Sequence, residues 1–406
     1  MGRLNDIIGE YAKKNPVRFH VPGHKGKSEN YNNPDYSLDV TELFFTDNLY
    51  NPSHEINLIY ELENRISKCF FKIPDIFSLI SCSGATLCIQ ASILALVKLK
   101  QSKKANKNLY IICDRASHIS FVNIISLLNI TPLWIYPGED FIKKINYFAQ
   151  NENFQDIIGV FVTSPDYFGV MKNIWQISQE CKKYLLNLVV DNSHGSHLAF
   201  YKNGELHPIN LGADISVDSI HKTLPVLTGA AILHANKKFD IDSDKTNILK
   251  ESINVFASTS PSYLILQSIE KMVDLLEKHG TEEHKRLIHD INLFKNKTEN
   301  LGFEFDSDKL YDPYRIVLNC ENAGEKLYYF LAERNILCEF FNKDRVILIP
   351  SIFNSSGDFE KLFDGLEYFA KINKIIPVKH KKNIYPPGVP TEINMQGATS
   401  PARRKI

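Results

Sequence analysis

The segment "LNLVVDNSH" at residues 186–194 decides the fold class. It is a short apolar run, rich in valine and leucine, that ends in polar residues. A nearly continuous apolar run of this length is typical of a strand that is covered on both faces of a sheet. A second run of the same form, "ADISVDSIH", follows at residues 213–221. Together the two segments predict neighbouring strands of a buried, mostly parallel sheet.

Four more runs extend this pattern, at residues 108–115, 132–137, 157–165 and 230–235. Several of the intervening segments can form helices, so the pattern predicts an α/β fold. Polar residues gather where the runs end, and ligands bind at that edge of an open α/β sheet. These residues are Asp114 and Arg115, Ser164 and Asp166, Asp191 and His194, and His221 and Lys222.

The 406 residues provide enough material for more than one domain. A long helical pattern begins near residue 262, and a smaller α+β region with candidate strands "RIVLNC" and "RVILIP" follows it. We expect four parts: an N-terminal arm at 1–56, a large domain at 57–262, a linker helix with a small C-terminal domain at 263–375, and a tail at 376–406.

The bulk composition narrows the class of protein. Lys+Arg and Asp+Glu both number 47, which argues against a nucleic acid held by a basic surface. The N-terminus has no apolar signal region, and no window approaches the roughly 20 apolar residues of a membrane helix. Seven scattered cysteines without a CxxC pair fit reduced thiols. We therefore expect a cytoplasmic protein that binds neither nucleic acid nor membrane.

Three segments could carry chemistry, and each also has a structural interpretation. "SCSGAT" at 81–86 runs into an apolar helix, so it is either a phosphate-binding helix start or a start capped by Ser83. Asp191, His194 and His197 could ligate a metal, but no second cluster at zinc spacing supports this, and we expect no metal. Lys222 is either a solvated loop residue or an imine-forming lysine.

A different motif also surrounds this lysine. Ser219 and Lys222 match the S-x-x-K of serine acyl-transfer enzymes, although the companion S-D-N and K-T-G motifs are missing. The three segments taken together favour another explanation. A helix start for phosphate, an acid for the pyridine nitrogen and a lysine for the imine are the three requirements of pyridoxal phosphate.

At this point the chain resembles the ornithine/lysine/arginine decarboxylase family, in its short form without the N-terminal regulatory domain. Eight motifs occur in the family's order: "FHVPGHKGK" (19–27), "DVTELFFTDNLYNP" (39–52), "DRASHIS" (114–120), "TSPDYFGV" (163–170), "DNSHGSH" (191–197), "SIHKTLPVLTG" (219–229), "STSPSY" (258–263) and "YPPGVP" (385–390). The resemblance implies the type I fold of pyridoxal-phosphate enzymes, with a mostly parallel seven-stranded sheet in the large domain and a smaller α+β C-terminal domain.

The resemblance also implies roles for individual residues. Lys222 would form the imine, Asp191 would keep the ring nitrogen protonated, and His118 would stack on the ring, with His194 beside it. The phosphate would contact Ser83, Gly84 and Ala85, assisted by Ser219 and His221, while Ser258 or Thr259 would reach the cofactor of a neighbouring subunit in a homodimer.

The chain departs from the family pattern at several positions. Asn192 and Ser193 replace the usual Glu-Ala, Asp166 replaces a threonine, and "TEINMQG" follows "YPPGVP". We expect none of these changes to touch Lys222 or Asp191, but they leave the substrate open. The implied function is decarboxylation of arginine, lysine or ornithine, with arginine slightly favoured. Transamination or aldol cleavage with the same cofactor, or a degenerate ligand-binding protein, are the alternatives.

Overall fold

The computed structural model describes residues 17–19, 58–101, 108–150, 152–239, 247–259, 261–305 and 310–373. The motifs at 39–52 and 385–390, nearly all of the motif at 19–27, and the expected C-terminal tail lie outside these residues. Among the residues described, none of the helices combines the length and the apolar character that a membrane crossing requires.

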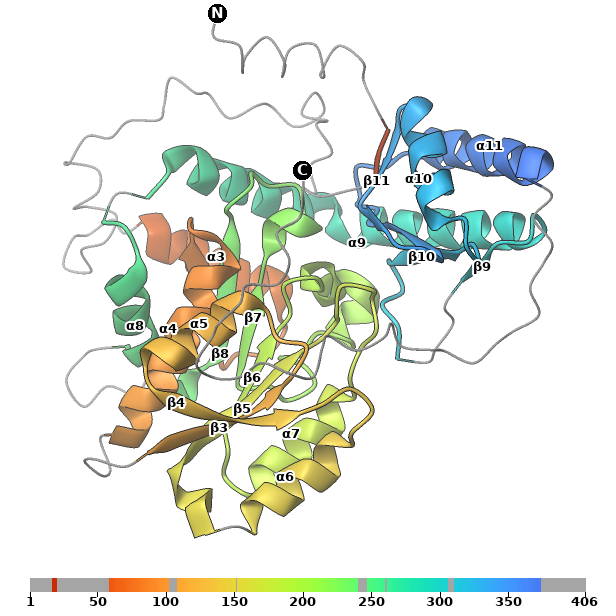
Figure 1. Ribbon diagram of the computed structural model, residues 1–406. Coiled ribbons are helices and arrows are strands. Elements are labelled where there is room, and N and C mark those ends of the chain that lie inside the picture. The colour runs from red at the N-terminus through yellow and green to blue at the C-terminus, as the bar shows by residue number, and fades with distance from the viewer. Residues whose placement is uncertain are drawn as a thin grey trace, which may run out of the picture.

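A seven-stranded sheet forms the centre of the molecule (Figure 1). Its strands are β2 (Ile76–Ser81), β3 (Leu109–Asp114), β4 (Ile130–Ile135), β5 (Ile157–Thr163), β6 (Leu188–Asp191), β7 (Ile215–Asp218) and β8 (Ala231–Asn236). Their order is β2-β8-β7-β6-β5-β3-β4, and β8 is antiparallel to both of its neighbours while the other pairs are parallel. The predicted fold class is confirmed. The apolar runs had revealed every strand except β2, whose run is interrupted by the buried Ser78.

Helices cover both faces of this sheet. They are α3 (Leu58–Phe70), α4 (Gly84–Gln101), α5 (Ile119–Leu127), α6 (Phe141–Ala149), α7 (Ile174–Lys183) and α8 (Ile248–Phe256). One hydrophobic core joins α4, α5 and α8 to the sheet, and a second joins α6 and α7 to its other face. The apolar residues of α4 lie around most of its circumference because the helix is buried between the sheet and its neighbours.

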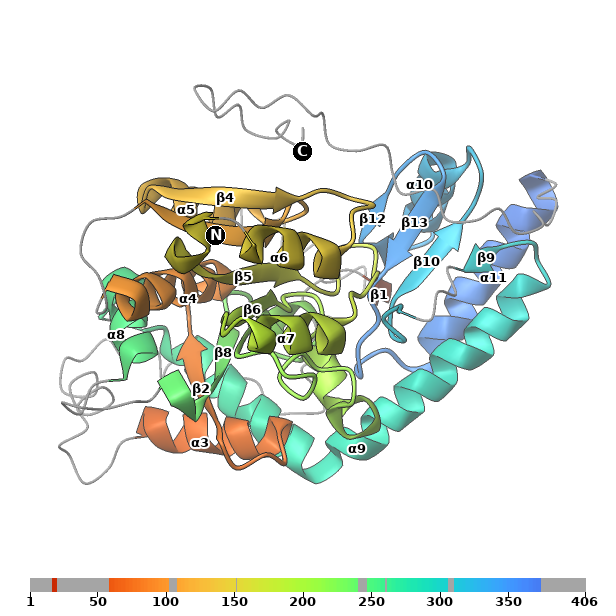
Figure 2. The same cartoon turned by 90° about the horizontal axis from the view of Figure 1, so that it is seen from below.

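The 37-residue helix α9 (Tyr263–Glu299) runs from the large sheet to a smaller α+β unit, as Figure 2 shows. That unit contains an antiparallel sheet of order β12-β13-β10-β9, flanked by α10 and α11, and a parallel pair of β1 with β11. The bounds are β1 (Val17–Phe19), β9 (Glu304–Phe305), β10 (Ile316–Asn319), α10 (Gly324–Glu333), β11 (Ile336–Cys338), β12 (Phe340–Phe341), β13 (Arg345–Leu348) and α11 (Ser356–Asn373). The four domain boundaries stay a prediction, and β1 shows that the expected arm contributes a strand to the small unit.

Candidate active site

Lys222 lies in a short 3-10 turn, Ile220–Lys222, that follows the end of β7. Its Nζ is 2.9 Å from Nε2 of His194, which follows β6. Burial lowers the pKa of Lys222, the negative charge of Asp191 opposes this shift, and Arg315 adds to it. A lysine with a lowered pKa is more often neutral, which is the nucleophilic form.

His194 is the direct partner of this lysine. Burial, followed by the charges of Lys222 and Arg315, holds the pKa of His194 well below its ordinary value. The imidazole is therefore neutral at neutral pH. A neutral imidazole has one protonated and one unprotonated nitrogen, so it can exchange a proton with Lys222 across the 2.9 Å contact.

Asp191 ends β6, where its neighbour on β7 is Val217. Its Oδ1 accepts hydrogen bonds from the backbone N–H of Ser193 at 3.1 Å and from the Ser193 hydroxyl at 2.5 Å. Its Oδ2 accepts none from the residues that the structure describes. The expectation that the family departures avoid Asp191 is wrong, because Ser193 replaces an alanine and places its hydroxyl on this carboxylate.

His118 caps the N-terminus of α5. The backbone N–H of Ser120 donates to its Nδ1 at 3.2 Å, and the Ser120 hydroxyl lies 2.8 Å from the same atom. This contact fixes the ring and leaves its proton on Nε2. Burial lowers the pKa of His118. The negative charge of Asp191 opposes this shift, and the positive charge of Lys222 adds to it. The charges of Asp191 and Lys222 both act on His118, and Lys222 contacts His194, while the catalytic roles of the four residues stay a prediction.

The expected phosphate end lies at the start of α4. Gly84 has φ +72°, and nothing lies within 4 Å of the position that a Cβ would take, so the space before the helix is open. The Gly84 N–H already donates to the carbonyl of Gly229 at 2.7 Å. The N–H groups of Ala85 and Thr86, which helix geometry leaves without an intrahelical partner, are thus better placed for a phosphate than that of Gly84. The Ser83 side chain is exposed, and Ser81 braces the turn through the backbone of Ser83 and Gly84.

Ser219 and His221 contact each other near the same end of the sheet. His221 Nδ1 lies 2.9 Å from the carbonyl of Ala230 and 3.3 Å from the Ser219 hydroxyl. A carbonyl only accepts, so Nδ1 carries the proton, and Nε2 can donate only when the ring is doubly protonated. Burial lowers the pKa of His221, so a phosphate contact would require the anion to favour the charged ring.

The remaining expected cofactor contacts are Ser258 and Thr259. Ser258 and Thr259 follow α8, and both are exposed on this chain. Their role toward a neighbouring subunit stays a prediction. The departing residue Asp166 has a local role, since its Oδ1 accepts the backbone N–H groups of Phe168 and Val170, both at 2.9 Å.

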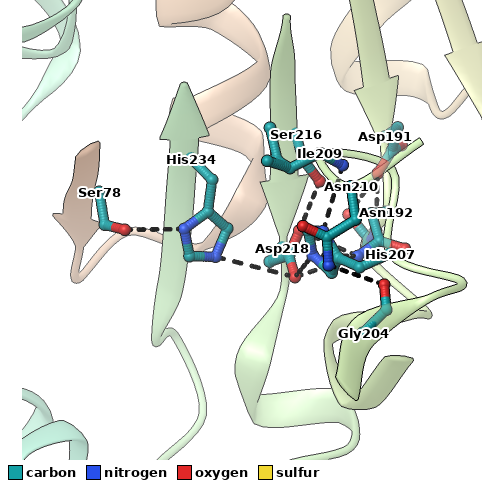
Figure 3. A network of polar contacts seen from close by, with 11 residues as sticks. Ser78, Asp191, Asn192, Gly204, His207, Ile209, Asn210, Ser216, Asp218 and His234 are labelled. Carbon is teal, nitrogen blue, oxygen red and sulfur yellow. Dashed lines mark hydrogen bonds and ion pairs between the residues drawn. The ribbon is translucent and has the colours of Figure 1, made fainter. Parts of the chain in front are cut away.

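A buried polar network lies behind Asp191, on the opposite face of the sheet (Figure 3). Asp218 accepts hydrogen bonds from Asn192 Nδ2 at 3.0 Å, from the Ser216 hydroxyl at 2.7 Å and from His207 Nε2 at 3.0 Å. His234 Nε2 is 4.0 Å from the same carboxylate, and its Nδ1 is 2.8 Å from the Ser78 hydroxyl. The sequence did not reveal this network, because Asp218 and Asp191 both stand at the end of a short apolar strand and their local sequences do not distinguish them.

His207, Asp218 and His234 are close enough to be considered as metal ligands, since their ligand atoms lie within 4.8 Å of one another. The hydrogen bonds argue for a proton instead. The backbone N–H of Ile209 donates to His207 Nδ1 at 3.3 Å, so a neutral ring carries its proton on Nε2, the atom that a metal would need. We therefore interpret the cluster as a hydrogen-bonded support of β7.

The three residues considered as metal ligands from the sequence have three different partners. Asp191 bonds with Ser193, His194 with Lys222, and His197 Nε2 with Asp312 Oδ1 at 2.9 Å. Asp312 belongs to the segment that leads into the small domain. His197 thus connects the two parts of the molecule rather than joining a metal centre.

The small domain supplies site neighbours that no motif had indicated. Arg315 is fully buried, and its Nη2 donates to the carbonyl of His194 at 3.3 Å. Glu339 accepts a hydrogen bond at 2.7 Å from the hydroxyl of Tyr167, whose ring meets the His194 ring edge to face at 5.3 Å. Residues so far apart in the chain have no spacing that sequence reasoning could use.

The donor set fits pyridoxal phosphate. The open space before α4 suits a phosphate, Asp191 has an oxygen without a described donor, and Lys222 lies on the neighbouring strand end with a lowered pKa. They match the three groups that the cofactor requires, which are an anion site, a partner for the pyridine nitrogen and an imine-forming amine.

Comparison with known proteins gives the family. Residues 93–315, more than half of the chain, match the family model described as Orn/Lys/Arg decarboxylase, major domain. The chain is 27% identical to the "Uncharacterized protein YaaO" of Bacillus subtilis, over 85% of this chain and 73% of that protein. It is 26% identical to an "Arginine decarboxylase" of Halalkalibacterium halodurans, over 94% of this chain and 80% of that protein.

Solved structures agree on the fold. The E. coli constitutive lysine decarboxylase superposes with a TM-score of 0.60 at 18% identity, over 77% of this chain and 51% of that one, so this chain spans about half of its length. A NifS-like protein gives a TM-score of 0.60 at 14% identity, over 88% of this chain and 100% of that one. The chain therefore belongs to the Orn/Lys/Arg decarboxylase family, and it is an amino acid decarboxylase with the type I fold of pyridoxal-phosphate enzymes.

Proposed function

We propose that this enzyme removes the α-carboxylate of a basic amino acid as CO2, with arginine preferred over lysine and ornithine. The observation that carries the proposal is the 2.9 Å contact between Lys222 Nζ and His194, beside the strand that ends in Asp191. The name of the Halalkalibacterium halodurans relative, "Arginine decarboxylase", supports the choice of arginine.

The residues divide the work of holding pyridoxal phosphate. Lys222 would attach it covalently, Asp191 would pair with its ring nitrogen through Oδ2, and His118 would cover one ring face. Ser83, Gly84, Ala85, Ser219 and His221 would surround the phosphate. When bound, the cofactor supplies an electron sink for the pair of electrons that the departing carboxylate leaves behind.

Lys222 and His194 are placed to manage the protons. Burial lowers the pKa of both groups, so it favours the neutral form of each relative to the same side chain in water. A free Lys222 amine would lie beside His194, at the 2.9 Å distance of their contact, and could share a proton with it. Either group could then return a proton to the substrate carbon after CO2 leaves.

The assembly belongs to the same proposal. We infer a cytoplasmic homodimer in which Ser258 or Thr259 of one subunit reaches the cofactor phosphate of the other. Light scattering would give the mass in solution. A dimer whose cofactor affinity falls in Ser258→Ala or Thr259→Ala would support shared sites, and a fully active monomer would contradict them.

A panel of amino acids with CO2 release as the readout tests the activity. We expect agmatine and CO2 from arginine, and no CO2 from Lys222→Ala. A keto acid product would instead indicate transamination. If the visible absorbance of bound cofactor is present but no amino acid is consumed, the protein is a ligand-binding family member and the proposed activity is wrong.

A further inference from the structure

Arg315 reaches from the small domain to the backbone of the turn that carries His194. It directly precedes β10, and its Nη2 donates to the carbonyl of His194 at 3.3 Å. The arginine side chain is only 1% exposed. Its stem packs against Gly169, where a Cβ would lie 2.7 Å from Arg315 Cγ. The glycine therefore leaves the space through which the guanidinium extends to His194.

A second contact joins the same two segments. His197 Nε2 lies 2.9 Å from Asp312 Oδ1, and both side chains are buried. The backbone N–H of Tyr314 also donates to this oxygen, at 3.0 Å. Residues 312–315 of the small domain thus hold residues 194–197 of the large domain at both ends.

The anchoring segment is itself held in place. The Arg315 backbone N–H donates to the carbonyl of Asp312 at 3.1 Å, and the Arg315 carbonyl accepts a hydrogen bond from Lys295 Nζ of α9 at 3.3 Å. The next residue, Ile316, pairs with Leu348 of β13. A side chain that is supported by a strand is a more precise anchor than one on a free loop.

The guanidinium also carries a charge that its surroundings balance incompletely. Its Nε is 3.8 Å from Asp312 Oδ2, and neither Nε nor Nη1 has a hydrogen-bond partner among the described residues. An arginine side chain stays charged at any ordinary pH. Burial is the largest cause of the lowered pKa of His194 and of Lys222, and the positive charge of Arg315 lowers both further.

Other charged groups act on the same two side chains. After burial, the groups that lower the pKa of His194 besides Arg315 are Lys222, His118 and His197. The groups that raise the pKa of Lys222 are Asp191 and Glu339. Arg315 thus opposes two carboxylates at the lysine.

We propose that Arg315 is a positioning residue for the proton exchange between His194 and Lys222, because it anchors the turn that carries His194 and keeps a positive charge beside the pair. This inference rests on the proposed decarboxylase function, in which these two groups manage the protons. Arg315 acts through the protein backbone and through its charge, so it has no need to touch the substrate. Its removal should therefore change kcat more than KM.

The first test removes the anchor and the charge together. In the protein loaded with pyridoxal phosphate, Arg315→Met should lower kcat for CO2 release by about 10–100-fold, the range for a hydrogen bond to a charged group, with KM little changed. Arg315→Lys keeps the charge without the planar fork, so its kcat should fall less. Arg334→Met is the matched control, because that guanidinium is partly exposed and stacks on Phe330 at the end of α10.

A titration of the visible absorbance distinguishes this role from a merely structural one. The colour of the bound cofactor reports whether the Lys222 nitrogen attached to it is protonated. A nearby positive charge disfavours protonation, so its removal should raise the pH midpoint of the titration in Arg315→Met. The midpoint should stay nearly unchanged in Arg315→Lys and in Arg334→Met. This measurement requires no turnover.

A second variant keeps the proposal testable if Arg315→Met does not fold. The double variant Arg315→Met with Asp312→Asn leaves no uncompensated charge at this buried pair and keeps an acceptor for His197 Nε2. Its titration midpoint should also rise, because Arg315 rather than Asp312 is among the charges that act on Lys222.

Three results would overturn the inference. They are a midpoint that does not move when Arg315 is replaced by Met, an equal shift in Arg315→Lys, and a higher KM with an unchanged kcat in Arg315→Met, which would place the guanidinium on the substrate. The absence of CO2 release by the wild-type protein from every amino acid would instead overturn the proposed function, and the absorbance titration separates that outcome from the other three.

Discussion

Two carboxylates lie at the ends of neighbouring strands and differ in what surrounds them. Asp191 ends β6 and Asp218 ends β7, and both are buried. Asp218 receives donors from Asn192, His207 and Ser216, shared between both of its oxygens. The described donors of Asp191 come from Ser193 alone and reach only Oδ1.

The difference distinguishes a supporting acid, whose oxygens are all occupied by donors of the protein, from a working acid, which keeps an oxygen for a ligand. A buried carboxylate is costly unless donors satisfy it. Burial by itself would raise the pKa of Asp218, but His207, His234 and Asn192 outweigh this effect and hold the pKa below its ordinary value. Asp218 is therefore a complete ionised support, whereas Asp191 retains an oxygen for a ligand.

The largest expected effect is on catalysis at Asp191. Asp191→Asn keeps the shape of the side chain and removes its charge, so under the proposed function the cofactor's ring nitrogen would lose its anionic partner. We expect kcat for CO2 release to fall at least about 10²-fold, as when a preorganised electrostatic contact is removed. The thermal unfolding midpoint should hardly change. A loss of only a few fold in kcat would show that Asp191 is not the pyridinium partner.

The second effect is on stability at Asp218. Asp218→Asn leaves three donors to share one amide oxygen, and Asn192→Asp puts a second carboxylate about 3.0 Å from the first. Each single change should lower the free energy of unfolding by about 3–5 kcal/mol. We expect kcat per folded molecule to stay close to wild type, in contrast to Asp191→Asn.

The double variant Asn192→Asp with Asp218→Asn is the matched control. It exchanges the amide and the carboxylate between the two positions. His207 Nε2 lies 3.2 Å from Asn192 Nδ2, so it could donate to a carboxylate at position 192 as well. Most of the lost stability should return, as measured by chemical denaturation. If the two losses simply add, the pair does not form the unit that we describe.

The large sheet could be predicted from sequence because its signals are local. Each buried strand is a continuous apolar run, and the rule that ligands bind at the carboxyl ends of such strands pointed to Asp191 and Lys222. Strand ends were less exact, since the run at 186–194 continues past the last strand residue, Asp191, into the turn that carries His194.

Other parts of the site had no such signal. Tyr167 and Glu339 are 172 residues apart, and they meet where the small domain lies against the sheet edge. Asp218 and Asp191 each follow a buried apolar strand, so the pattern cannot tell which carboxylate is already satisfied by donors. That distinction depends on His207, which reaches Asp218 from a separate loop.

Glu63 extends the comparison to a buried acid with too few donors. Its Oε1 accepts the backbone N–H of Ile80 at 3.0 Å, and burial raises the pKa of Glu63 to about 7 despite that bond. The folded state therefore holds a proton that the unfolded state releases near its ordinary value of 4.5. The stability from this proton is fully present below about pH 4.5 and is lost as the pH rises through about 7.

Glu63→Gln should remove that pH dependence. Gln keeps an acceptor for Ile80 and carries no charge, so we expect the variant to match wild type near pH 4.5. Above pH 7 it should be more stable by up to about 3 kcal/mol, since each pKa unit corresponds to about 1.4 kcal/mol. Denaturation curves at several pH values measure the difference. A variant less stable than wild type at pH 8 would mean that the folded state stabilises the ionised Glu63 carboxylate, so that folding does not raise its pKa.

The smallest expected effect concerns the hydroxyl that distinguishes this chain at Asp191. Ser193→Ala removes one donor from Oδ1 and leaves the backbone N–H of residue 193 in place at 3.1 Å. The negative charge on the carboxylate then becomes more available to the pyridinium, so kcat should rise by about two- to tenfold, the range of one hydrogen bond. Ser196→Ala is the control, because Ser196 lies in the same turn and its buried hydroxyl has no partner among the described residues. A tenfold fall in kcat for Ser193→Ala alone would show that the Ser193 hydroxyl orients Asp191. The orientation of the Asp191 carboxylate, rather than the availability of its Oδ2, would then distinguish this working acid from the supporting Asp218.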